Sequence, residues 1–150
     1  MNLKAFLVKN KIGHEFIEKK STHHSTEASA ATGIPVSMLM KTLVFLDEDS
    51  KPVIAIVMGD SHVSRHKLQE AAGRKSVRIA PDDAAEKATG YPTGGIPPFG
   101  HKKTYRTLID RKVAEKEEVW CGGGCRTKLV KLRTSDILKF TDSAVCDISM

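Results

Sequence analysis

A glycine- and proline-rich stretch at residues 89–100, TGYPTGGIPPFG, limits what this chain can fold into more than any other segment. Its twelve residues include four glycines and three prolines, which excludes a regular helix or strand there. Gly94 and Gly95 can take positive φ and let a ligand approach the main chain closely. The prolines have no N–H group, so the N–H groups of Gly94, Gly95 and Ile96 are the local donors. A tight structural turn is the alternative, but proline on both sides favours a loop that binds a carbonyl oxygen, an oxyanion or a phosphate.

The length and charge of the chain narrow its class. It has 150 residues and no linker, so residues 1–150 are expected to form a single domain. The net charge of +6 points to an acidic partner such as nucleic acid, with a solvated basic face as the alternative. No apolar run suits a signal peptide or a membrane span, so no membrane partner is expected. The three cysteines have no disulfide-framework spacing, so we expect a cytoplasmic protein with reduced thiols.

Short segments of changing periodicity predict an α+β fold. Helical spacing of apolar residues predicts a helix at 2–10, and Thr26 and Ser64 are expected to N-cap two more, which end at glycines. Further helical segments are predicted at 37–40, from Pro81 onward and at 135–140. Strands are predicted at 14–19, 41–46, 52–58, 77–80, 107–110, 118–121, 128–132 and 145–148. Because no strand–helix–strand rhythm repeats, we expect a curved, mixed, barrel-like β-sheet surrounded by short helices.

Lys41 is the first candidate for a chemical role. It opens a predicted strand whose two faces are both mostly apolar, and an unpaired ammonium group is costly to bury there or has a depressed pKa. Lys41 therefore either extends out to solvent from the strand's first position or points into a polar cavity. Its position at the start of a central strand favours the cavity.

A second glycine loop, CGGGCRTK at residues 121–128, is expected to form another wall of that cavity, although a flexible hairpin connection is the alternative. Cys121 and Cys125 have a CxxxC spacing with no second pair, so neither a structural zinc nor a redox centre is expected. The HVSRH sequence at 62–66 lacks the glutamate of a metalloprotease motif. His23 and His24 lie in the loop before the Thr26 cap and could border a site, although loop histidines are usually exposed. No nucleophile–base arrangement can be assembled from the sequence.

Basic residues follow both glycine loops and are suited to contact a phosphate backbone. The predicted tRNA-binding residues are Lys102, Lys103, Arg106 and Arg126.

Several motifs together resemble the YbaK/prolyl-tRNA-synthetase-associated domain family. They are MKTLVF around Lys41, GDSHVSRHKL, TGYPTGGIPPFGHKK, and CGGGCRTKLVKL with SDILKF, in family order and spacing from about residue 22 to the end. The resemblance implies a barrel-like mixed sheet and a free-standing aminoacyl-tRNA deacylase that edits mischarged tRNA in trans. The expected substrate is tRNA for proline carrying cysteine, alanine or a similar small amino acid, and prolyl-tRNA synthetase is an expected partner. Lys41 corresponds to the family's key lysine.

This resemblance fits the chemistry that the residues offer. An aminoacyl ester is already activated, so a positioned water and a stabilised oxyanion suffice without a metal or an organic cofactor. The N–H groups of Gly94, Gly95 and Ile96 would bind the oxyanion, and Lys41 would bind the carbonyl or a terminal phosphate. Because no protein base is present, the tRNA 2′-hydroxyl would orient the attacking water. In cysteine-specific members the substrate's own thiol would attack instead. The residues expected around the substrate are Thr26, Met40, Phe45, Pro97, Gly122, Gly123 and Gly124. A non-catalytic RNA-binding module of the same fold is the alternative, against which the intact Lys41 and glycine loops argue.

Overall fold

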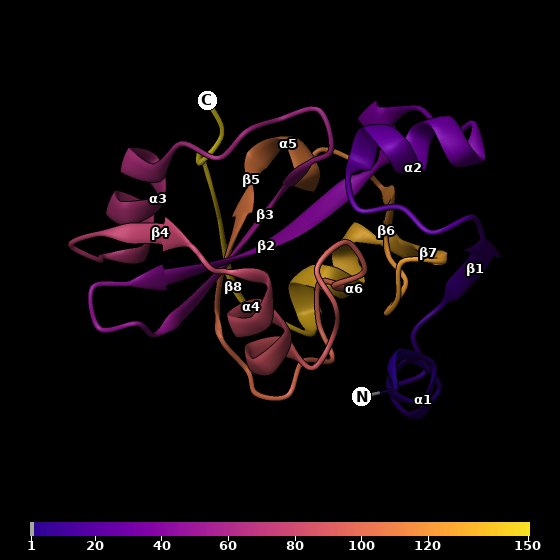
Figure 1. Cartoon of the computed structure of the whole chain (residues 1–150), viewed down its shortest axis with the longest axis horizontal. Helices are drawn as coiled ribbons and strands as arrows, with labels where there is room; N and C mark the ends of the chain where they lie inside the picture. Colours follow the sequence, from indigo (N-terminus) through magenta and orange to yellow (C-terminus); the bar gives the residue numbers. More distant parts are fainter. Residues whose placement is uncertain (1) are drawn as a thin grey trace.

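In the computed structural model, which describes residues 2–150, the chain forms two β-sheets flanked by short helices (Figure 1). The strands are β1 (His14–Glu18), β2 (Met40–Asp47), β3 (Pro52–Met58), β4 (Val77–Ile79), β5 (Arg106–Asp110), β6 (Glu118–Gly122), β7 (Lys128–Arg133) and β8 (Asp142–Cys146). The helices are α1 (Leu3–Lys9), α2 (Ser25–Thr32), α3 (Arg65–Ala72), α4 (Asp82–Thr89), α5 (Arg111–Ala114) and α6 (Thr134–Lys139), with a 3₁₀ turn η1 (Val36–Met38).

The strand pairing confirms a mixed α+β architecture. The five-stranded sheet has the order β4-β2-β3-β5-β8, in which β2 pairs antiparallel with β3 and β4, while β5 pairs parallel with β3 and β8. The three-stranded sheet, β1-β7-β6, is antiparallel throughout. The expected single barrel-like sheet is not what the pairing gives: the two sheets are separate, and an isolated bridge between Leu39 and Trp120 links them.

One edge of β2 is left partly uncovered. Its partner β4 has only three residues and pairs with Phe45–Asp47 alone. The Gly59 N–H donates to the Leu39 carbonyl at the β3 side, whereas the Ala80 N–H donates to the Val44 carbonyl at the other side. Since main-chain groups alternate between the two edges of a strand, the N–H and C=O of Thr42 point away from β3. We call this side of β2 around Thr42, between the Leu39–Trp120 bridge and the Ala80–Val44 hydrogen bond, the open edge of β2.

The two faces of the five-stranded sheet pack into different core clusters. Met40 and Val44 belong to the larger cluster, which also contains Ile96 of the glycine–proline loop. Phe45 belongs to the other cluster, together with Leu68 of α3. Because side chains alternate along a strand, Thr42 lies on the face of β2 turned toward the loop, and Lys41 lies on the opposite face.

Helix α3 begins and ends as predicted. The Ser64 hydroxyl accepts a hydrogen bond from the Lys67 N–H at 3.2 Å, and Gly73 ends the helix with φ of 67°. The cap of α2 differs from the prediction: His24, not Thr26, is its N-cap, and Ser25 is its first residue. The Glu27 carboxylate fixes this start by accepting the His24 N–H at 3.0 Å.

Three other elements differ from the prediction because strand pairing and local turns override the sequence pattern. Strand β8 covers Asp142–Cys146 instead of 145–148, since parallel pairing with β5 sets its limits. The helix α5 was not predicted because it is a single turn directly after β5, where the Asp110 carboxylate accepts the Lys112 N–H. Pro81 is the N-cap of α4 and not its first helical residue.

Candidate active site

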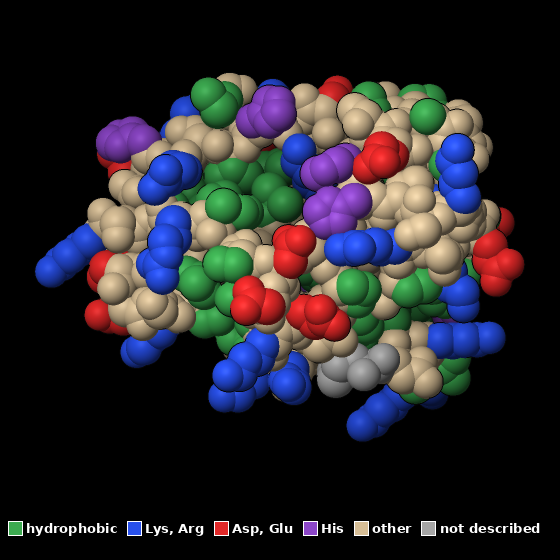
Figure 2. All heavy atoms as spheres, viewed as in Figure 1, with side chains coloured by type: hydrophobic (Ala, Val, Ile, Leu, Met, Phe, Trp, Pro, Cys, Tyr) green, Lys and Arg blue, Asp and Glu red, His purple; other side chains and the backbone are tan. Residues whose placement is uncertain are grey.

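A cavity of about 690 Å³ lies along the open edge of β2. Figure 2 shows this face of the molecule, where hydrophobic side chains line a hollow that histidine, lysine and acidic side chains border. The cavity is walled by α2, β2, the start of α4 and both glycine loops. Of the residues predicted from the sequence, it brings together Thr26, Met40, Lys41, Gly94, Ile96 and Gly122.

The other predicted substrate-binding residues do not line the cavity. Phe45 is buried in the core cluster with Leu68, on the face of β2 that is turned away from the loop. Pro97, Gly123 and Gly124 are likewise absent from the cavity wall among the described residues. The Gly95 N–H, predicted as an oxyanion donor, instead donates to the Pro92 carbonyl at 2.9 Å.

The two glycine loops pack against each other through their main chains. A β-carbon on Gly95 would lie 2.6 Å from the carbonyl carbon of Cys125, and one on Gly122 would lie 2.6 Å from the Ile96 carbonyl oxygen. The Gly124 N–H donates to the Gly95 carbonyl at 2.8 Å. Close loop-to-loop packing, and not ligand approach, therefore explains why glycine stands at positions 95 and 122.

Two N–H groups of the first loop remain available. Within residues 2–150, neither the Gly94 nor the Ile96 N–H donates to a protein acceptor, and both residues line the cavity. Gly94 has φ of 90°, and a β-carbon there would lie 3.0 Å from the Cα of His23. Gly94 therefore needs to be glycine both for its conformation and for its contact with the segment before α2.

Side chains from outside the loop hold it in place. The Arg126 Nε donates to the Thr93 carbonyl at 2.7 Å, and the His101 Nε2 lies 2.6 Å from the Pro97 carbonyl oxygen. Burial lowers the pKa of His101, although the hydrogen bond to Pro97 opposes this, so a neutral ring with Nε2–H as the donor fits the contact. A loop clamped in this way can present its amides without rearranging.

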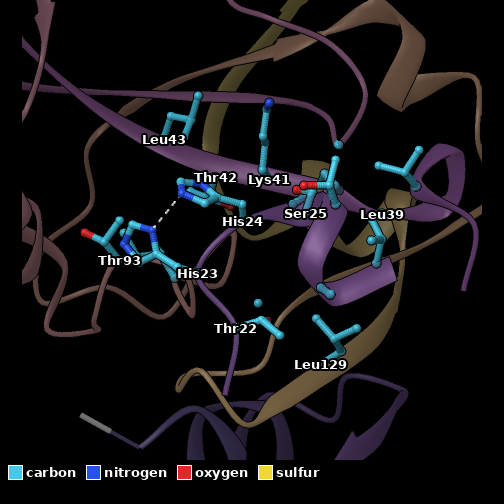
Figure 3. A pocket seen from close by; sticks show the side chains of 18 of the residues that line it. Thr22, His23, His24, Ser25, Leu39, Lys41, Thr42, Leu43, Thr93 and Leu129 are labelled. Carbon is cyan, nitrogen blue, oxygen red and sulfur yellow. Dashed lines mark hydrogen bonds between the residues drawn. The ribbon is translucent and has the colours of Figure 1, made fainter. Parts of the chain in front are cut away.

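Lys41 is half-buried at the cavity wall (Figure 3). It takes part in none of the ion pairs within residues 2–150. Burial lowers the pKa of Lys41, and the Asp60 carboxylate, which also lines the cavity, partly offsets that effect. Lys41 thus borders the cavity, and its role there stays a prediction.

His23 and His24, which the sequence allowed to border a site, both line the cavity; His24 is exposed and His23 is partly buried. His23 Nδ1 lies 3.4 Å from His24 Nε2, and the rings pack edge to face with centroids 4.6 Å apart (Figure 3). The His23 side chain is 33% exposed, and its Nε2 lies 3.8 Å from an Asp82 carboxylate oxygen. Their position directly before a helix that borders the cavity is the signal that could have identified them.

The predicted tRNA-binding residues have different surroundings. Lys102 and Lys103 are exposed. Arg106 pairs with Asp142 at 3.2 Å, and Arg126 is engaged by the glycine–proline loop. The two lysines are thus the members of this set that are free to meet a phosphate.

Residues 2–150 contain no group of three or more His, Cys, Asp or Glu side chains placed to hold a metal ion. The three cysteines are free thiols, and burial raises the pKa of Cys121 well above its ordinary value. Within the same residues, no helix combines the length and apolar character needed to cross a membrane.

Comparison with known proteins defines the class to which this fold and cavity belong. The family model for the aminoacyl-tRNA editing domain matches residues 19–140. EbsC of Enterococcus faecalis, a candidate Cys-tRNA(Pro)/Cys-tRNA(Cys) deacylase, is 30% identical over 128 residues, covering 85% of this chain and 78% of its own. A proline–tRNA ligase of Nitratidesulfovibrio vulgaris is 36% identical over 91 residues, which are 61% of this chain but only 16% of the ligase.

Solved structures show the same relationship. A candidate trans-editing enzyme for prolyl-tRNA synthetase superposes with a TM-score of 0.87 at 27% identity, covering 99% of this chain and 94% of its own. The hypothetical protein APE2540 superposes with a TM-score of 0.89 at 26% identity and 99% coverage of both chains. The chain belongs to the aminoacyl-tRNA editing domain family, and the resemblance to the YbaK-like proteins is confirmed.

Proposed function

We propose that this protein is a free-standing deacylase that hydrolyses, in trans, the ester of mischarged aminoacyl-tRNA. The expected substrate is tRNA for proline carrying a small amino acid such as cysteine, alanine or serine. One observation carries the proposal: two unengaged N–H groups and a half-buried ammonium group border one cavity large enough for an aminoacyl-adenosine end. Membership of the editing-domain family supports the same reaction class.

The N–H groups of Gly94 and Ile96 would bind the ester carbonyl oxygen and the oxyanion that forms from it. Arg126 and His101 hold this loop by its carbonyls, so the donors are fixed before substrate arrives. Fixed donors stabilise a developing charge without the cost of reorganisation. Gly95, the third residue predicted to donate, is not proposed for this role because its N–H is engaged within the loop.

Lys41 would act on the nucleotide side of the ester. It lies on the face of β2 opposite Thr42 and the glycine–proline loop, so the cavity passes around the open edge between them. An ammonium group there is suited to a terminal phosphate oxygen, which it would hold as a point charge. Lys41 would thereby fix the 3′-adenosine while the loop amides hold the acyl group.

The attacking water would be oriented by the 2′-hydroxyl of the terminal ribose. The water oxygen bonds to the carbonyl carbon, and the ester C–O bond breaks. The 3′-oxygen of the ribose leaves with a proton released by the water. The products are free amino acid and uncharged tRNA. Effective positioning can supply much of the barrier reduction for such an activated ester.

The proposed macromolecular partner is the acceptor end of the tRNA, with a prolyl-tRNA synthetase as a second partner. Lys102 and Lys103 directly follow the glycine–proline loop and are exposed, and the net charge is +6. Such residues would meet phosphates near the cavity mouth.

A deacylation panel tests the proposal. The purified protein is mixed with one tRNA species for proline charged with cysteine, alanine, serine or proline, and the remaining ester is measured over time. We expect release of at least one noncognate amino acid while prolyl-tRNA persists. Tight tRNA binding without any hydrolysis would instead identify a non-catalytic RNA-binding module.

A further inference from the structure

Three unsatisfied polar atoms belong to residues of the same cavity wall. Within residues 2–150, four buried side-chain nitrogen or oxygen atoms lack a hydrogen-bond partner: His23 Nε2, Thr42 Oγ1, Thr93 Oγ1 and Thr134 Oγ1. The first three belong to residues that line the cavity, and Thr134 does not. Buried polar side chains almost always find partners, so a concentration of exceptions at one cavity points to a partner that comes from a ligand.

The three residues lie toward the same part of the cavity. Thr42 faces the glycine–proline loop because it stands between Met40 and Val44, which pack in the same core cluster as Ile96. Thr93 directly precedes Gly94, where an added β-carbon would lie 3.0 Å from the Cα of His23. Figure 3 accordingly draws Thr93 beside His23, with Thr42 on the neighbouring strand. This part of the cavity also holds the two free N–H groups proposed to bind the acyl carbonyl.

The immediate surroundings of Thr42 are apolar and buried. Thr42 itself is 7% exposed, and its neighbours Met40, Val44 and Ile96 are buried. The Asp82 carboxylate lies 3.8 Å from His23 Nε2, which is beyond hydrogen-bond distance. Because the Thr42 hydroxyl stands among buried apolar side chains, we expect a short, uncharged ligand group beside it.

We propose that His23, Thr42 and Thr93 form a polar specificity site for an aminoacyl group whose short side chain carries a hydroxyl, as serine does. This inference rests on the proposed deacylase function and names its substrate class. A hydroxyl donates one hydrogen bond and accepts two, which equals the three protein groups offered. A thiol is a weak donor and acceptor, and a methyl group is neither.

The threonine hydroxyls can meet such a ligand by a rotation about χ1. The three staggered χ1 positions exchange the hydroxyl and methyl groups of threonine, so a bound hydroxyl can draw Oγ1 toward the cavity. An alanyl group would leave these atoms unpaired, and sites built to bond a substrate hydroxyl reject the analogue without it by up to about 10⁴–10⁵-fold.

The test compares seryl and alanyl esters on the same tRNA. Wild-type protein is expected to deacylate seryl-tRNA faster than alanyl-tRNA, with kcat/KM measured for each. In Thr42→Val and in Thr93→Val, the ratio of seryl to alanyl kcat/KM should fall by about tenfold, because valine keeps the shape of threonine but removes one hydrogen bond. The kcat/KM for cysteinyl-tRNA is expected to lie between the values for seryl-tRNA and alanyl-tRNA.

Thr134→Val is the matched control. It removes a buried, unpartnered hydroxyl of the same kind at the start of α6, away from the cavity wall. Its ratio of seryl to alanyl kcat/KM should equal that of wild type. Thermal unfolding of all three variants is measured alongside, and Thr93→Val decides the matter if Thr42→Val does not fold.

The outcomes separate this inference from the function on which it rests. A wild-type protein that releases alanine as fast as serine, or an unchanged ratio in both cavity variants, overturns the polar specificity site and leaves the deacylase intact. Hydrolysis of none of the esters overturns the deacylase, and the specificity site with it. A ratio that falls in the cavity variants and not in Thr134→Val supports both.

Discussion

Gly95 and Gly94 are neighbours in the same loop, and they are glycine for different reasons. Gly95 is pressed against the Cys125 main chain, and its N–H is engaged within its own loop. Gly94 takes positive φ and lines the cavity, and its N–H donates to no acceptor within residues 2–150. The sequence predicted a ligand loop here, but it could not separate the two roles, because the contact that distinguishes them comes from a segment thirty residues later.

Gly95→Ala is expected to destabilise the protein by about 1–3 kcal/mol, since the added methyl group has to displace backbone atoms of Cys125 and not a flexible side chain. Thermal unfolding measures this, and deacylation should fall with it because the loop that carries Gly94 shifts. Gly13→Ala is the control, as a β-carbon there meets nothing within 4 Å. Wild-type stability in Gly95→Ala would show that the loops are not packed as described.

At the scale of elements, most helices and strands followed from periodicity, caps and glycine stops, as α3 and the β2–β3 hairpin show. The sequence did not predict that β4 is too short to pair with the first half of β2. The edge of β2 around Thr42 is therefore left uncovered. The cavity depends on this uncovered edge. The position of His23 and His24 before a helix allowed them to border a site, but the sequence could not show that they line the same cavity as Thr42.

The β2–β3 hairpin has a pH-dependent anchor in Asp47. Burial disfavours its ionised form, but N–H groups of Lys51 and Asp49 and the Arg74 guanidinium, 2.8 Å away, outweigh that effect and lower the pKa of Asp47. A lowered pKa in the folded state adds stability above the ordinary value of about 3.9 and loses it as the pH falls through the lowered value.

Asp47→Asn should therefore unfold at a lower temperature than wild type at pH 7, and the difference should narrow below a pH of about 4. Thermal unfolding across this pH range measures the effect. Asp49→Asn serves as the control because Asp49 is exposed in the same turn. A difference in unfolding temperature between Asp47→Asn and wild type that stays constant with pH would contradict a stabilising role for the Asp47 charge.

At the scale of the whole molecule, the sequence predicted the α+β class and the family, and it missed the division into two sheets. Strand existence is encoded locally, whereas sheet membership depends on pairing between distant segments. Phe45 shows the consequence for the site: it belongs to the same strand as Lys41, but it is covered by α3 and lies in the second core cluster.

The net charge of +6 predicts salt-dependent binding of tRNA. The slope of log affinity against log salt should be steep, and the double variant Lys102→Gln/Lys103→Gln should flatten it by up to about 2, since each phosphate contact contributes about 0.7–0.9. Filter binding between low and moderate salt measures the slope. The control Lys51→Gln, in the turn between β2 and β3, should have the same slope as wild type. If the double variant has the wild-type slope, Lys102 and Lys103 do not contact tRNA phosphates.

Lys41 offers the most direct test of the proposed catalytic arrangement. Single-turnover deacylation by wild type and Lys41→Ala is compared on the best substrate of the panel, with thermal unfolding recorded for both. We expect the rate to fall by at least about 100-fold, because without the contact to the terminal phosphate the ester is no longer held in line with the loop amides. The fold should survive, because a half-buried ammonium group adds no stability. A folded Lys41→Ala protein that deacylates at the wild-type rate would contradict the proposed role of Lys41 in deacylation.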